Sequence, residues 1–120
     1  MIYLLFIAFQ AKHFICDYPL QNNYMLKKGS DKDWVFPLSL HCFVHALFTF
    51  IIAIFVTSFS LAIIVALIDF VIHFSMDRIK ASKKMLGKYN PSDKSFWVSL
   101  GFDQMIDHLT SILLIWIILQ

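Results

Sequence analysis

Histidine and aspartate residues recur at intervals of four inside the long apolar stretches of this chain. In chain order, the sets are His13 with Asp17, His41 with His45, Asp69 with His73 and Asp77, and Asp103 with Asp107. An interval of four residues places side chains on one face of a helix. Polar residues in apolar segments of membrane-spanning length are energetically costly and usually serve a function. The spacing therefore predicts that four helices each turn one polar face toward a shared intramembrane cluster.

The residue composition favours a membrane protein. Of the 120 residues, 59% are hydrophobic and 15% are charged, whereas soluble domains have about 25% charged residues. Too few polar residues are present to cover a soluble core, so lipid is the expected solvent and membrane lipids are expected partners. The net charge of +2 is too small to indicate a nucleic-acid partner. Cys16 and Cys42 lie in apolar segments and are expected to be buried without a disulfide.

Four apolar segments have about the 20 residues that a helix needs to cross a bilayer. They cover residues 2–20, 36–56, 61–80 and 96–119. The first has no basic region or cleavage pattern, so we expect it to remain in the mature protein. A short turn-forming stretch at 57–60 predicts a tight hairpin between the second and third segments. The sequence predicts an all-α fold, a four-transmembrane-helix bundle forming a single integral membrane domain over residues 1–120.

Basic residues lie in two of the three connections and in their flanks. They are Lys27, Lys28 and Lys32 in the first and Arg78, Lys80, Lys83, Lys84, Lys88 and Lys94 in the third. Because basic loops mark the cytoplasmic side, both termini are expected to be extracytoplasmic. At about 1.5 Å per residue, the polar residues of all four segments then share one layer near the cytoplasmic face. Lys12, inside the first segment, is expected to snorkel or to pair with an aspartate.

Imidazole and carboxylate side chains together suit a divalent metal such as Zn, Mn or Fe. Four-helix bundles hold one or two metal ions with inward-facing residues of these types. The candidate metal ligands are His13, Asp17, His41, His45, His73 and Asp77. Asp103 and Asp107 are candidate catalytic residues, as ligands or as a general base acting on metal-activated water. His108 follows Asp107 directly, so the two side chains cannot both point inward.

Three functions are compatible with such a cluster. The leading hypothesis is a metal-dependent hydrolase of a membrane-associated substrate, and the second is a protein that moves protons or metal ions. The third is a small regulator that binds a membrane-protein partner, and a homo-oligomer is a further possibility. One transmembrane histidine or aspartate is commonly explained by interhelical hydrogen bonding, but four polar faces at one depth favour a functional site. The outer half of each segment is largely apolar, which disfavours transport.

Four motifs carry a resemblance to a known family. They are H-x-x-x-D-Y-x-L-Q from His13 to Gln21, His41 with His45, His73 with Asp77, and Asp103-Gln104. The chain resembles an uncharacterised family of small bacterial and phage membrane proteins, known only as a domain of unknown function. The resemblance covers nearly the whole chain and implies a bacterial inner-membrane protein with a polar centre. It is also loosely similar to membrane-bound metal-dependent hydrolases. The fourth motif departs from the family pattern, because Asp107 occupies the usual histidine position.

Overall fold

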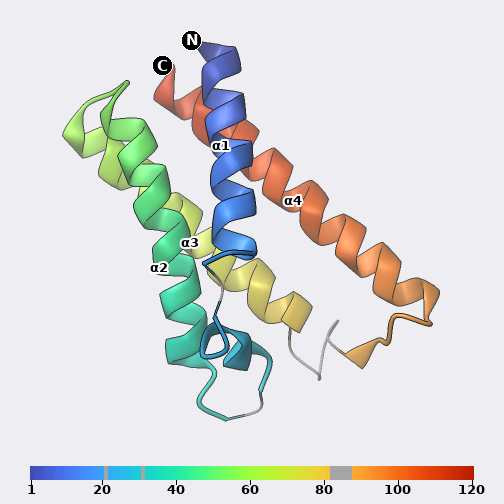
Figure 1. Ribbon diagram of the computed structural model, residues 1–120. Coiled ribbons are helices and arrows are strands. Elements are labelled where there is room, and N and C mark those ends of the chain that lie inside the picture. Colours follow the sequence, from blue (N-terminus) through green and yellow to red (C-terminus); the bar gives the residue numbers. More distant parts are fainter. Residues whose placement is uncertain (21, 31, 82–87) are drawn as a thin grey trace.

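The computed structural model describes residues 1–20, 22–30, 32–81 and 88–120. Its elements, in chain order, are α1 (Ile2–Asp17), the short 3-10 helix η1 (Met25–Gly29), α2 (Val35–Ile54), α3 (Phe59–Ala81) and α4 (Lys94–Ile118). The four long helices form a bundle (Figure 1), and no strand occurs in the described ranges. The predicted all-α fold is therefore confirmed.

The four helices alternate in direction along the chain. Both termini and the α2–α3 turn lie at one end of the bundle, and the two longer connections lie at the other (Figure 1). In the same view α4 crosses behind α1, and its Lys94 end lies away from α2. This arrangement agrees with the predicted placement of the two basic connections on one side. Of the predicted residues there, Gln21, Lys83 and Lys84 lie outside the described part of the chain.

The first helix is shorter than the predicted segment. It ends at Asp17, where the Tyr18 N–H still donates to the Phe14 carbonyl at 3.1 Å. Pro19 follows and has no N–H to donate, so the helix cannot continue in the regular pattern. Its 16 residues correspond to about 24 Å. Asp17 is therefore the last residue of α1.

The α2–α3 hairpin is closed by a serine cap. The Thr57 N–H donates to the Ala53 carbonyl at 2.9 Å, which completes the last turn of α2. The Ser58 hydroxyl then accepts a hydrogen bond from the Leu61 N–H at 3.2 Å. A serine in this position satisfies a free N–H of the first helical turn. As a result α3 begins at Phe59, two residues before the predicted boundary at 61.

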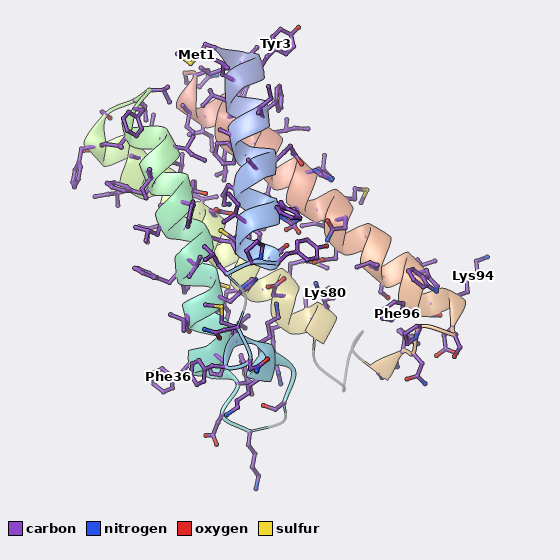
Figure 2. All side chains as sticks on the ribbon, viewed as in Figure 1. Met1, Tyr3, Phe36, Lys80, Lys94 and Phe96 are labelled. Atoms are coloured by element: carbon purple, nitrogen blue, oxygen red, sulfur yellow. The ribbon has the colours of Figure 1, made fainter. Side chains whose placement is uncertain are left out.

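The outer surface of the bundle is apolar. Helices α2, α3 and α4 are each long and apolar enough to cross a membrane, which fits an integral membrane protein. Many large apolar side chains are exposed, and Tyr3 and Phe36 point away from the helices (Figure 2). Both cysteines are buried and free, as expected.

A buried apolar core occupies the half of the bundle that holds the termini. Its members are Leu5, Phe9, Ala53, Ala62, Val65, Leu114, Ile115 and Ile118. All four helices contribute to it, as the apolar outer halves of the predicted segments require. Because this half is filled by apolar side chains, the polar faces of the same helices meet in the other half.

Candidate metal centre

The polar residues of all four helices turn into the bundle. His41, His45 and Asp69 have no exposed surface. The other predicted members range from buried to half-buried; they are His13, Asp17, His73, Asp77, Asp103 and Asp107. His108 is exposed while Asp107 is buried. The two neighbours therefore separate as the helical spacing predicts.

Asp17 is the point at which α1 meets the two histidines of α2. Its Oδ1 atom lies 2.8 Å from His45 Nε2 and 3.3 Å from His41 Nε2. Its Oδ2 atom lies 3.2 Å from Nε2 of His13, one turn earlier on α1. The four-residue intervals on both helices thus bring three imidazoles around one carboxylate.

His41 also contacts Asp77, which is paired with Lys28 of the short helix η1. His41 Nε2 lies 3.0 Å from Asp77 Oδ2, and the same oxygen accepts a hydrogen bond from Lys28 Nζ at 3.0 Å. Arg78 fixes the backbone around this lysine, since it donates to the Lys28 carbonyl at 2.8 Å and lies over the Trp34 ring at 3.9 Å. Helix η1 therefore closes this side of the cluster with a buried positive charge.

His73 lies between two carboxylates. Its Nε2 atom is 3.0 Å from Asp69 Oδ1, and its Nδ1 atom is 3.5 Å from Asp107 Oδ1. The other oxygen of Asp107 is 3.7 Å from His13 Nδ1. Asp107 on α4 therefore links the histidine of α3 to the histidine of α1. The His45 ring stacks on His73 with centroids 4.1 Å apart, so all four inward histidines are neighbours.

Asp69 is the deepest member of the cluster and is held by a lysine. Lys12 Nζ donates to Asp69 Oδ2 at 2.7 Å, and the Thr49 hydroxyl donates to the same oxygen. Lys12 is buried, so it pairs with an aspartate instead of snorkelling. Thr49 continues the four-residue interval of His41 and His45 on α2, which is the signal that would have identified it in the sequence.

Asp103 has different surroundings from Asp107. Its Oδ2 atom accepts hydrogen bonds from Lys80 at 3.0 Å and from Gln104 Nε2 at 3.3 Å. The Gln104 Oε1 atom is in turn 3.1 Å from His13 Nε2. Asp103 therefore reaches the imidazoles through Gln104, whereas Asp107 faces them directly. Lys80 and Gln104 were predicted as a topology signal and a motif residue, not as partners in the cluster.

The cluster combines carboxylates with groups that can carry positive charge. Asp69, Asp77 and Asp103 are paired with Lys12, Lys28 and Lys80. Asp17 and Asp107 lie beside the histidines. Buried carboxylates need positively charged or hydrogen-bonding neighbours, and the imidazoles are among those of Asp17 and Asp107.

The ligand geometry is compatible with a cation. Asp17, His41 and His45 offer ligand atoms that lie within 4.8 Å of one another. Two ligands with bonds of about 2.0–2.1 Å in a tetrahedral arrangement are roughly 3.3 Å apart, close to the distances measured around Asp17. His41 Nε2 lies near two carboxylate oxygens but makes no well-aligned hydrogen bond to a described residue. The atom is therefore a candidate metal ligand.

The α1 side is the accessible side of the cluster. The side chains of His13 and Asp17 are 15% and 22% exposed, whereas those of His41 and His45 are fully buried. A catalytic metal site needs one open position in addition to its protein ligands. Here the partly exposed side chains come from α1, and the fully buried histidines come from α2.

The chain belongs to the family described as Protein of unknown function (DUF3307), whose model matches residues 4–120. The predicted family resemblance is thereby confirmed, and the family description assigns no activity. No curated protein matches the chain. No solved structure matches it either. Hydrolysis, metal binding and phage origin therefore stay predictions.

Proposed function

We propose that this membrane protein holds a divalent metal at Asp17, His41 and His45 and hydrolyses a membrane-associated substrate, such as a lipid or lipid-linked headgroup. One observation carries the proposal: a single Asp17 oxygen lies within 3.3 Å of two buried imidazole Nε2 atoms.

The surrounding residues suit a hydrolytic reaction. A bound divalent ion such as Zn, Mn or Fe supplies a water nucleophile at neutral pH. Asp107 faces His13 and His73, where it would act as a further ligand or as the base that accepts a proton from the attacking water. Asp77 lies 3.0 Å from the same Nε2 atom of His41 and is therefore a further candidate ligand. Asp103, held by Lys80, positions Gln104 against His13.

The proposed location is the cytoplasmic side of a bacterial inner membrane. The two basic connections share one end of the bundle (Figure 1), and the polar cluster lies in the same half of the helices. Positively charged connections favour the cytoplasm, so both termini are proposed to be extracytoplasmic. In this orientation the partly exposed edge of His13 and Asp17 is near the headgroups of the inner leaflet.

The test is the metal content of the full chain purified in detergent. The parent protein is expected to contain Zn, Mn or Fe in at least one equivalent per chain by mass spectrometry. His41→Ala combined with His45→Ala is expected to remove it while circular dichroism shows unchanged helicity. Asp93→Asn, at the exposed start of α4, is the matched control and should retain the metal. A metal-free parent, or a double variant that keeps its metal, would reject the proposal.

A second function, proton movement, is favoured by one observation. Carboxylates and imidazoles alternate from Asp69 through His73, Asp107 and His13 to Asp17, with separations of 3.0 to 3.7 Å. Such alternation is typical of proton relays in membrane proteins. Proteoliposomes containing a pH-sensitive dye would show proton flux that Asp107→Asn abolishes. Tight vesicles without flux would leave hydrolysis as the better explanation.

A further inference from the structure

We infer that the cluster holds two divalent ions and that the Asp17 carboxylate bridges them. This inference rests on the proposed function, because it requires the cluster to bind metal at all. The first ion would occupy the site formed by Asp17, His41 and His45. The second would occupy a site formed by Asp17, His13 and Asp107, whose ligand atoms also lie within 4.8 Å of one another.

The two oxygens of Asp17 face different groups of ligands. Oδ1 is the atom near His45 and His41, at 2.8 and 3.3 Å. Oδ2 is the atom near His13 Nε2, at 3.2 Å. A carboxylate that presents one oxygen to each of two imidazole groups is arranged as a bridge. The same residue therefore serves both groups without any change in its position.

The imidazoles of His13 and His45 approach Asp17 through different oxygen atoms. Nε2 of His13 is 3.2 Å from Oδ2, and Nε2 of His45 is 2.8 Å from Oδ1. The planes of the two rings are tilted by 47°, so the rings are not stacked against each other. In two-metal sites the ions are about 3.5–4 Å apart, a distance that one bridging carboxylate can span.

Hydrogen bonds alone do not account for the surroundings of His13. Its Nε2 atom has two acceptors nearby, Asp17 at 3.2 Å and Gln104 at 3.1 Å, and its Nδ1 atom faces Asp107 at 3.7 Å. A neutral imidazole donates only one hydrogen bond, and 3.7 Å is too long for one. A cation among His13, Asp17 and Asp107 satisfies the two carboxylates together.

The two-ion site also indicates the class of substrate. Paired divalent ions stabilise the attacking and leaving oxygens of an in-line displacement, as in phosphatases and nucleases. This points to an anionic headgroup, such as a phosphate ester, as the substrate. The partly exposed Asp17 and His13 side chains place the two ions at the accessible edge of the cluster.

The test is metal stoichiometry in the full chain, reconstituted in detergent and loaded with Mn²⁺ alone. The parent is expected to bind two ions per chain and to give the electron paramagnetic resonance spectrum of a spin-coupled pair. Asp107→Asn is expected to bind one ion and to give the spectrum of isolated Mn²⁺. Should this variant fail to fold, His13→Gln tests the same site. Asp93→Asn, at the exposed start of α4, should keep two coupled ions.

Each alternative outcome overturns a different part of the inference. One ion in both the parent and Asp107→Asn would reject the second site and leave the proposed single metal intact. Two ions without spin coupling would reject Asp17 as the bridge. No ion in the parent would reject the inference together with the proposed function.

Discussion

Replacing Lys12 by methionine is expected to destabilise the bundle strongly. Lys12 Nζ is 2.7 Å from Asp69 Oδ2, and the two side chains are 5% and 0% exposed. Removing one partner of a buried ion pair leaves an uncompensated charge and costs about 3–5 kcal/mol. Asp69 keeps the Thr49 hydroxyl as a donor, so we expect the lower end, about 3 kcal/mol. That value corresponds to a change of more than about 100-fold in the unfolding equilibrium.

A matched control lies elsewhere in the same cluster. Lys80 and Asp103 form the same type of pair at 3.0 Å, but the lysine is 31% exposed. Water reaches this lysine, and Gln104 still donates to Asp103 when the lysine is removed, so Lys80→Met is expected to cost less stability than Lys12→Met. Combining Lys12→Met with Asp69→Leu removes both charges and should recover most of the lost stability, because apolar pairs commonly replace buried ion pairs at little cost.

The assay is reversible unfolding in mixed micelles of increasing SDS mole fraction, followed by circular dichroism. Measurements are made with excess chelator, so that loss of bound metal does not contribute to the difference in unfolding free energy. The reasoning is refuted if Lys12→Met is no more destabilising than Lys80→Met. It is also refuted if the double variant is less stable than Lys12→Met alone.

Three further results are expected. Bound metal should be released as the pH falls, because protons compete with metal for neutral imidazole; metal content unchanged down to pH values where free histidine is protonated would exclude histidine ligands. Asp103→Asn should lower metal content or activity while Asp93→Asn leaves both unchanged, because Asp103 is buried and Asp93 is exposed; equal tolerance of both changes would remove the case for Asp103. Reporter fusions should place Gln120 outside the cytoplasm and Lys88 inside it, and the reverse result would move the cluster to the opposite face.

The residue intervals were sufficient to predict which side chains enter the cluster. Helical geometry is local, so an interval of four fixes a shared face without knowledge of the neighbouring helices. Asp107 and His108 show this clearly, because the inward residue follows from the position of Asp103 alone. The apolar outer halves likewise follow from composition, since only apolar side chains remain to fill that half of the bundle.

Partners from the connections could not be predicted in the same way. Lys28 lies on a short helix inside a polar connection, and its contact with Asp77 depends on how that connection folds back under α3. The sequence attributes such lysines to membrane topology, and nothing local distinguishes one that turns inward. Lys80 is different, because it lies three residues after Asp77 on the same helix face and was recognisable in principle. The end of α1 at Asp17 was also recognisable, from Pro19.

The position of the apolar core argues for chemistry at one face of the membrane. An ion crossing the bundle from the cluster would have to pass Phe9, Val65 and Leu114, which are fully buried among other apolar side chains. Moving a charge through such a region without polar partners is highly unfavourable. The histidines and aspartates of the cluster reach the surface at the partly exposed α1 edge of His13 and Asp17. Within the described residues of one chain, this arrangement suits a substrate that arrives and leaves on the same side, as hydrolysis of a headgroup requires.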